Sequence, residues 1–160
     1  MRIKSLVAED FVNYKVPSMF IISSVCSWKC CIEQGLDISI CQNSDLAKQK
    51  VLDISNEMLY NMFISNPITE AIVIGGLEPF DQFDEVLDFV AYFRENNIDN
   101  YIVIYTGYYP NEVIPLINRL KNYKNIIIKF GRYIPNRPKR YDEVLGLELV
   151  SDNQFAEIIS

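Results

Sequence analysis

The sequence predicts an α/β fold with a mostly parallel sheet, in the form of a partial (βα) barrel or a curved open sheet of about five strands with helices on the outside. Two observations lead to this prediction. Short apolar runs alternate along the chain with segments in which apolar residues have helical spacing. The chain has 160 residues and no linker or repeat, which fits a single domain over residues 1–160 but not the eight βα units of a closed barrel.

The predicted strands are the short apolar runs. The first 17 residues are mixed in character and predict a short strand or an extended arm. The continuous apolar runs beyond them are typical of strands that are buried on both faces of a sheet. These runs are residues 19–22, 71–74, 101–105 and 125–129, and residues 147–150 are a candidate fifth strand.

Helical patterns fill most of the intervals between these strands. Ser55 and Asp81 are expected to precede the first two helices as caps, because short polar side chains accept hydrogen bonds from a first turn. A third helix is expected over residues 111–121, where Pro115 predicts a lost hydrogen bond early in the helix or a kink. The apolar faces consist of Met58, Leu59, Met62 and Phe63 in the first helix, Phe83, Val86, Leu87, Val90 and Phe93 in the second, and Val113, Ile114, Ile117 and Leu120 in the third.

Composition and charge exclude several classes of function. The net charge of −6 argues against a general nucleic-acid binder, and the one basic cluster, residues 132–140, is expected to be a solvated or docking loop. Histidine is absent, which excludes histidine acid–base catalysis, the serine triad and every zinc site that uses histidine. No apolar run has the length of a membrane span and no signal peptide begins the sequence, so a cytoplasmic protein with reduced cysteines is expected.

All four cysteines lie in one segment that follows the first apolar run. The segment begins with Cys26-Ser27-Trp28-Lys29-Cys30-Cys31 and ends with Ile40-Cys41-Gln42-Asn43. Structural cysteines scatter along a sequence, whereas the ligands of a soft metal centre cluster, because a short loop gathers thiolates at a small entropic cost. The clustering predicts metal binding. The alternatives are unligated apolar thiols, or two disulfides in a secreted chain.

Two further turns are expected to converge with the cysteine segment. Gly75-Gly76-Leu77-Glu78-Pro79 follows the second apolar run, and Thr106-Gly107-Tyr108 follows the third. Right-handed crossovers place the C-terminal ends of parallel strands at one edge of the sheet, where ligands bind in such folds. Gly75 and Gly76 are expected where the backbone needs a positive φ or comes close to a ligand, although such a pair alone also suits a tight turn.

Together, the cysteine segment and the Gly-Gly-Leu-Glu-Pro turn resemble the radical S-adenosylmethionine (SAM) superfamily. Its members carry three cluster cysteines after the first strand and a Gly-Gly-Glu-Pro segment after the second. The chain resembles most closely the small activating proteins of anaerobic (class III) ribonucleotide reductase, along nearly its whole length. Residues 10–13, 105–108 and 151–154 are similar to three further segments of those proteins, in the same order.

The chain also departs from this family. The usual cysteine spacing is Cys-x3-Cys-x2-Cys, but Glu33 stands in place of the third cysteine. Cys26 and Cys30 keep the first spacing, and Cys41 is expected to be the third ligand because residues 40–43 keep the family signature around it. Cys31 is the alternative third ligand, since clusters accept varied loop spacings. Leu77 is an insertion in the Gly-Gly-Glu-Pro segment, and Lys129-Phe130-Gly131 stands where the family usually has Asp before Gly.

The resemblance implies a radical SAM oxidoreductase with a [4Fe-4S] cluster and SAM as cofactors. Three cysteines hold the cluster and leave one iron open for the amino and carboxylate groups of SAM. The reduced cluster passes an electron to the sulfonium, which gives methionine and a 5′-deoxyadenosyl radical. By the resemblance, the backbone of Gly75, Gly76 and Leu77, with Glu78, receives the amino group of SAM, and Asn43 and Thr106 are candidate polar contacts to SAM.

The partner implied by the resemblance is a glycyl radical enzyme, the large subunit of an anaerobic ribonucleotide reductase, with a one-electron donor such as flavodoxin or ferredoxin. The partner must insert a glycine-containing loop into the open side of the sheet. Three alternatives stay open: another small radical SAM enzyme with a different substrate, a non-enzymatic zinc module that uses all four cysteines, and a family member that has lost activity.

Overall fold

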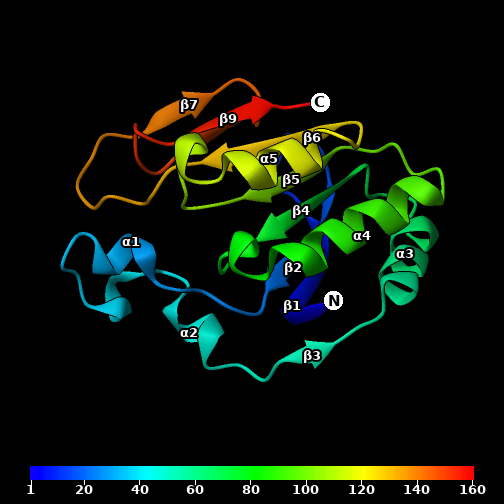
Figure 1. Cartoon of the computed structure of the whole chain (residues 1–160), viewed down its shortest axis with the longest axis horizontal. Helices are drawn as coiled ribbons and strands as arrows, with labels where there is room; N and C mark the ends of the chain where they lie inside the picture. The colour runs from blue at the N-terminus through cyan, green and yellow to red at the C-terminus, as the bar shows by residue number, and fades with distance from the viewer.

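The computed structural model describes residues 1–160 and contains a seven-stranded sheet with the order β3-β1-β2-β4-β5-β6-β9 (Figure 1). The strands are β1 (Arg2–Asp10), β2 (Ser18–Ser23), β3 (Leu52–Asp53), β4 (Ala71–Gly75), β5 (Ile102–Tyr105), β6 (Ile126–Phe130), β7 (Arg140–Asp142), β8 (Leu147–Leu149) and β9 (Phe155–Ile158). The helices are α1 (Lys29–Ile32), α2 (Ser44–Ala47), α3 (Asn56–Ser65), α4 (Phe83–Glu95) and α5 (Ile114–Leu120), with 3-10 turns η1 (Ile38–Ile40), η2 (Pro79–Gln82) and η3 (Pro110–Glu112).

The predicted fold class is confirmed. Strands β2, β4, β5 and β6 are parallel, and the sheet stays open because β3 and β9 form its two edges. Strand β1 is antiparallel to β2, and β9 is antiparallel to β6. In Figure 1 the arrowheads of β4, β5 and β6 point toward the side of the molecule where α1 lies. The C-terminal edge of the parallel strands therefore faces the cysteine segment.

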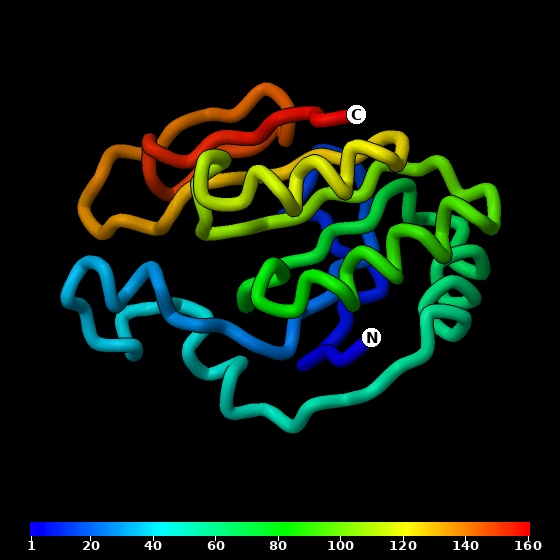
Figure 2. The backbone as a smooth tube through the Cα atoms, in the orientation of Figure 1, coloured from blue at the N-terminus to red at the C-terminus, as the bar shows by residue number.

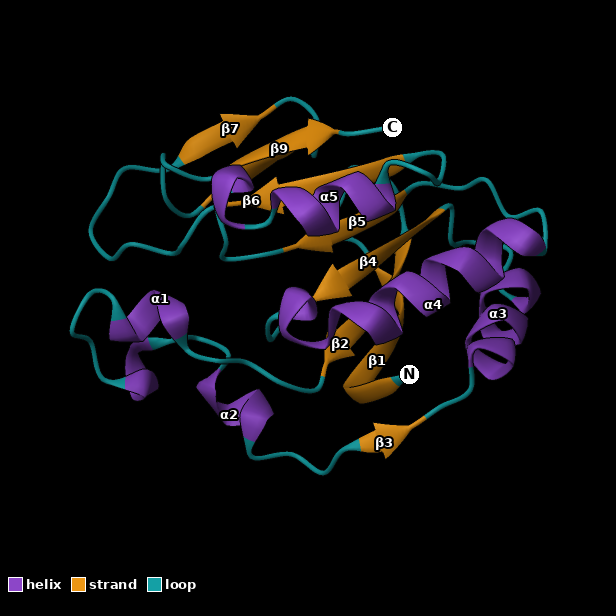
Figure 3. Ribbon diagram, in the orientation of Figure 1, coloured by secondary structure: helices purple, strands orange, loops and turns teal.

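The sheet is buried on both faces, which explains the continuous apolar runs. Helices α3, α4 and α5 cover one face, and their inward side chains form the larger core with Ile72, Ile104, Ile128 and their neighbours (Figure 3). A smaller core on the other face contains Val73 and Val103 and is covered in part by Leu145 and Leu149, which flank or belong to β8. Alternate strand residues thus serve two separate cores.

Several sequence predictions need correction at the edges of this sheet. Residues 147–150 do not add a fifth strand to the main sheet, because β8 pairs only with β7 in a separate two-stranded sheet. The outer edge of β9 is occupied instead, since the buried Asp142 carboxylate accepts a hydrogen bond from the Ala156 backbone N–H at 2.9 Å. The strand β9 itself was not predicted, because its short sequence lacks a continuous apolar run.

The helices also differ in detail from their predicted patterns. Ser55 caps α3 as expected, accepting a hydrogen bond from the Met58 N–H, but Met58 itself is 55% exposed. Only a narrow stripe of α3 is buried, and among the helices α3 packs chiefly against α4. Pro115 lies in the first turn of α5, where the missing N–H breaks no helical bond, so the helix starts there and has no kink.

Asp81 is not the cap of α4, which is a second correction to the helices. Pro79 begins the turn η2, in which the Phe80 N–H donates to the Glu78 side chain, and α4 begins only after Gln82. The Asp81 carboxylate is therefore free to contact other segments.

Candidate functional site

A cavity of about 340 Å³ lies at the C-terminal edge of the parallel strands. Its lining comes from the segments that follow β2, β4, β5 and β6, together with residues 12–13 and the β7–β8 hairpin. The predicted site residues that line it are Cys26, Cys30, Cys41, Asn43, Gly76, Leu77, Glu78 and Thr106, and the alternative ligand Cys31 lines it as well. Gly75 is the one predicted site residue that does not. The convergence expected from parallel topology therefore holds for these turns.

The turn after β4 requires glycine at position 76. Gly76 has a φ of 79°, and a Cβ atom there would lie 2.7 Å from the Ile22 side chain. Its carbonyl oxygen accepts a hydrogen bond of 2.6 Å from the Asn43 side-chain amide. Two predicted site residues are thus in contact with each other, and the Gly76 oxygen keeps a second lone pair for a ligand.

Glu78 is a buried carboxylate that joins the turns after β4 and β5. One oxygen accepts hydrogen bonds from the Thr106 hydroxyl at 2.7 Å and the Phe80 N–H at 3.1 Å, and the other accepts from the Gly107 N–H at 2.8 Å. Burial raises the pKa of Glu78 to about 7, although these three donors favour the charged form. The Thr106 hydroxyl in turn accepts from the Tyr108 N–H. Glu78 and Thr106 therefore connect the turns after β4 and β5 where these turns line the cavity.

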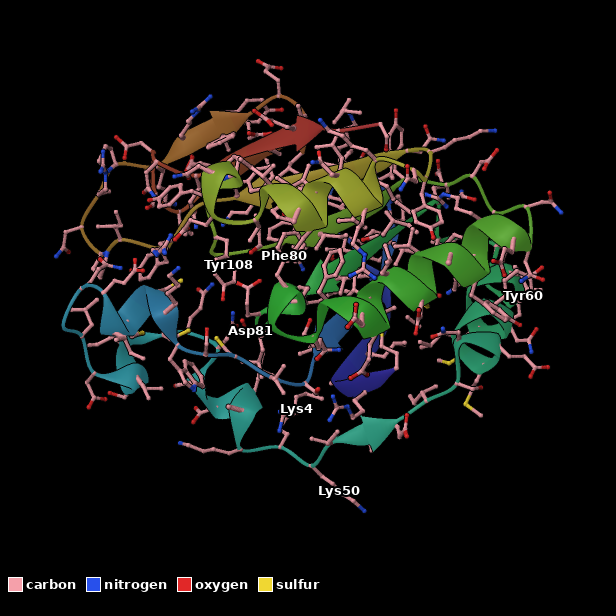
Figure 4. The ribbon with its side chains drawn as sticks, viewed as in Figure 1. Lys4, Lys50, Tyr60, Phe80, Asp81 and Tyr108 are labelled. Carbon is pink, nitrogen blue, oxygen red and sulfur yellow. The ribbon has the colours of Figure 1, made fainter.

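Residues of the turn η2, directly before α4, hold the beginning of the cysteine segment in place. Asp81 accepts hydrogen bonds from the Ser27 N–H and from the Tyr108 hydroxyl, which bring the segments after β2, β4 and β5 together. Figure 4 shows Asp81 and Tyr108 close to each other, far from Tyr60 on α3. The buried Gln82 side chain accepts hydrogen bonds from both the N–H and the hydroxyl of Ser24. No pattern in the sequence indicates these contacts.

Cys26 and Cys30 face this fixed part of the cavity. The Cys26 sulfur accepts a hydrogen bond of 3.3 Å from the Trp28 N–H, and burial raises the pKa of the Cys26 thiol to about 12. Burial also raises the pKa of Cys30. A Cβ atom at Gly107 would lie 2.6 Å from the Cys30 sulfur, so only glycine leaves room for this thiol. Both thiols are largely desolvated and need a cation to become thiolates.

Cys31 and Cys41 line the same cavity. Cys31 is buried within α1, and Cys41 is partly exposed directly after η1. No three Cys, Asp or Glu side chains are gathered closely enough to hold a metal ion as they stand. The third ligand thus stays a prediction: Cys41 by its sequence signature, with Cys31 as the alternative.

Glu33, which stands in place of the usual third cysteine, forms an ion pair. Its carboxylate contacts the Arg132 guanidinium at 2.6 and 2.9 Å, and Glu112 contacts the same guanidinium at 2.7 Å twice. Lys29 adds a contact to Glu112 at 2.7 Å. These hydrogen bonds lower the pKa of Glu112 and raise that of Arg132. This ion-pair cluster of Lys29, Glu33, Glu112 and Arg132 fastens α1 to the segments after β5 and β6.

The basic loop therefore divides into two parts. Arg132 is buried, which contradicts the expectation of a solvated loop for that residue. Arg137 and Lys139 are exposed and pair with Asp152 and Glu148, as a solvated loop predicts. Arg132 follows the apolar strand β6 more closely than the other basic residues do, and this position was the available signal that it differs from them.

Lys129 and Gln154 are buried polar residues that the sequence did not single out as site residues. Both line the cavity, and both donate a hydrogen bond of 3.2 Å to the Gly131 carbonyl oxygen. Burial lowers the pKa of Lys129 to about 8, against the opposing effect of Cys30 and Glu78. The side-chain oxygen Oε1 of Gln154 has no hydrogen-bond partner. The cavity is thus lined by buried polar side chains as well as by thiols.

The residues present fit an iron–sulfur cluster. Four soft donors from one segment line a single cavity, an N–H···S hydrogen bond supports Cys26, and Gly107 leaves room beside Cys30. Clusters of this kind are held by cysteine thiolates and tuned by hydrogen bonds to sulfur. No helix of the protein has the length and apolar character needed to cross a membrane.

Comparison with known proteins agrees with this donor chemistry. The family model of the 4Fe-4S single cluster domain matches residues 19–149, which include every cysteine and all four parallel strands. No curated protein matches the chain. The match extends over most of the 160 residues, and the chain therefore belongs to the 4Fe-4S single cluster domain family.

Proposed function

We propose that this protein is a radical SAM enzyme that generates a glycyl radical on the large subunit of an anaerobic ribonucleotide reductase. One observation supports the proposal best. The cysteine segment and the turn of Gly76, Leu77 and Glu78 line the same cavity at the C-terminal edge of a parallel sheet. A simple electron-transfer protein needs the thiols but gives no reason for this second turn.

The proposed roles follow from where the side chains lie. Cys26, Cys30 and Cys41 hold the cluster and leave one iron for the cofactor. The Gly76 carbonyl oxygen uses its second lone pair to accept a hydrogen bond from the amino group of SAM. Asn43 donates to that same oxygen and so positions it, while Glu78 and Thr106 keep the neighbouring turns in place.

When bound, the reduced cluster supplies the electron that cleaves SAM to methionine and a 5′-deoxyadenosyl radical. The protein positions the cofactor and limits water near the reacting atoms. Leu77 and Cys31 are buried, and Leu149 closes the side toward the hairpin. These apolar side chains favour transfer of hydrogen from a protein substrate over quenching by solvent.

The substrate is proposed to enter from the open side of the sheet. Val12 and Val150 line the cavity and are 74% and 42% exposed, so each offers an apolar contact to a partner. A glycine-containing loop of the partner would cover these side chains and reach the cavity between the β1–β2 connection and the β7–β8 hairpin. Flavodoxin or ferredoxin is the proposed electron donor.

The first test is electron paramagnetic resonance on the anaerobically reconstituted and chemically reduced protein, with and without SAM. The proposal expects a [4Fe-4S]⁺ signal that changes on addition of SAM, and release of 5′-deoxyadenosine. Addition of the reductase should then give a glycyl radical signal. A cluster signal indifferent to SAM would contradict the radical SAM assignment, whereas SAM cleavage without a glycyl radical would point to a different substrate.

A further inference from the structure

Lys129 is a buried cation without an anionic partner. Its residue is 7% exposed, and no carboxylate lies within ion-pair distance of its ammonium group. Its one hydrogen bond goes to the Gly131 carbonyl oxygen, and its nitrogen lies 5.8 Å from the centre of the Tyr105 ring. An ammonium group has three donors, so two stay unused. Burial of such a charge is unfavourable unless a counter-charge is supplied.

The other buried lysine of the protein shows what a satisfied one looks like. Lys4 is 9% exposed, and its ammonium group donates to the carbonyl oxygens of Ala47 and Gln49 at 2.8 and 2.7 Å. These two bonds connect β1 to the end of α2, and Figure 4 shows Lys4 on that side of the molecule. Lys4 does not line the cavity. The hydrogen bonds of Lys4 account for the burial of its charge, whereas the single hydrogen bond of Lys129 does not.

The surroundings of Lys129 indicate which anion is missing. Glu78 is a carboxylate of the same cavity lining whose charge acts on Lys129, but three other donors already occupy it. Cys30 lines the same cavity, and its charge as a thiolate acts on Lys129 as well. A cluster held by three thiolates carries net negative charge, and its reduction adds one more negative charge. The bound cluster is therefore the anion that the position of Lys129 suits.

We propose that Lys129 is the counter-ion of the cysteine-bound cluster and raises its reduction potential by stabilising the reduced, more negative state. The inference rests on cluster binding, which the proposed function shares, but not on SAM cleavage. It explains why an ammonium group is buried at the end of β6, on the same wall as the unpartnered Gln154 oxygen. The proposed effect of Lys129 on the reduction potential is electrostatic and comes from the charge of its ammonium group.

The test is an anaerobic redox titration of the reconstituted holoprotein without SAM, followed by electron paramagnetic resonance. Lys129→Met should decrease the ratio of reduced to oxidised cluster about tenfold at a fixed potential, which is a shift of about 59 mV to more negative potential for one electron. Lys129→Arg should keep most of the wild-type potential because it keeps the charge. Lys4→Met is the matched control, since it removes a buried lysine away from the cavity and should leave the potential unchanged.

The outcomes separate this inference from the proposed function. An unchanged potential in Lys129→Met, in a protein whose wild-type cluster responds to SAM, would overturn the inference alone. The same unchanged potential with weakened SAM binding would assign the ammonium to a carboxylate of the cofactor instead. A wild-type protein that takes up no cluster would overturn both. Lys129→Gln, a smaller polar replacement, should give the same shift if Lys129→Met does not fold.

Discussion

The two halves of the cysteine segment are held in different ways. Residues 24–33 are tied to the core by Gln82, Asp81 and Arg132, which bond to Ser24, Ser27 and Glu33 respectively. Residues 34–43 have two side-chain hydrogen bonds to the rest of the protein, from Gln34 to the Tyr133 carbonyl and from Asn43 to the Gly76 carbonyl. Figure 2 shows the whole segment, blue to cyan, as a lobe beside the strand ends.

This difference indicates how the site is organised. Cys26 and Cys30 lie in the half that the protein holds in place without a metal, whereas Cys41 lies in the half that a metal would have to gather. Ordering of a loop by its ligand is common in metal sites, because the binding free energy offsets the entropy of the loop.

Loss of a cluster ligand is expected to have the largest effect. Cys26→Ala, Cys30→Ala and Cys41→Ala should each abolish SAM cleavage and the SAM-dependent change of the cluster signal, while Cys31→Ala should retain both. Iron and sulfide content, spectroscopy and 5′-deoxyadenosine release would measure these effects. Cys31→Ala is the matched control because it also removes a thiol from the same cavity. Full activity in Cys41→Ala would contradict the assignment of Cys41 as the third cluster ligand and favour Cys31.

The contrast between what the sequence predicted and what it did not has a physical basis. The parallel strands were predictable because burial on both faces leaves a continuous apolar run, and the cysteine segment because all thiols share it. The hydrogen bonds and ion pairs that hold residues 24–33 in place were not predictable, because each joins residues that are far apart in sequence. Arg132 and Glu33, for example, are 99 positions apart. Polar partners at such separation leave no local pattern.

Removal of the first tie should destabilise the whole protein. Gln82→Ala leaves the Ser24 N–H and hydroxyl without their acceptor, and the Arg2 carbonyl loses its donor. Buried polar groups without partners are unfavourable, so the free energy of unfolding should fall by about 3 kcal/mol. Urea unfolding followed by circular dichroism would measure it. Gln49→Ala, at an exposed position, should change the free energy by less than about 0.5 kcal/mol; equal losses in both variants would argue against this role for Gln82.

Loss of the ion-pair cluster should loosen α1 more than the rest of the protein. Arg132→Ala leaves Glu33 and Glu112 with Lys29 as their only cationic partner. Trp28, the single tryptophan, directly precedes α1, so its fluorescence reports local opening while circular dichroism reports the whole fold. The tryptophan transition in urea should move to lower denaturant ahead of the global one. Arg119→Ala, which breaks an exposed pair with Asp84, should leave the two transitions together.

Within residues 34–43, Asn43 makes the hydrogen bond that is closest to Cys41 in the sequence. Asn43→Ala removes the hydrogen bond to the Gly76 carbonyl, which should lower the stability by about 1 kcal/mol at most and free Cys41 without moving Cys26. Alkylation of the cluster-free protein by iodoacetamide, read by mass spectrometry, should accelerate at Cys41 alone. Gln42→Ala is the control, since that side chain is exposed. Equal acceleration at all four thiols would show that the two halves move together.

The smallest expected effect is a dependence of α1 on pH. Hydrogen bonds from Arg132 hold the pKa of Glu112 well below its ordinary value of 4.5. A carboxyl group whose pKa is depressed in the folded state stabilises that state above its unfolded pKa and loses this contribution as the pH falls toward the folded pKa. The ion-pair cluster should therefore be intact at neutral pH and weaken progressively below about pH 4.5.

Trp28 fluorescence along an acid titration would detect this weakening as an opening near α1. Glu112→Gln keeps the shape of the side chain but cannot titrate, so its fluorescence should change less with pH over the same range. Because Lys29 and Glu112 are partly exposed to solvent, added salt should weaken the wild-type cluster at neutral pH as well, and leave Glu112→Gln nearly unaffected. An acid response of the same size in both proteins would mean that other carboxylates control the position of α1, and that the first half of the cysteine segment depends chiefly on Asp81 and Gln82.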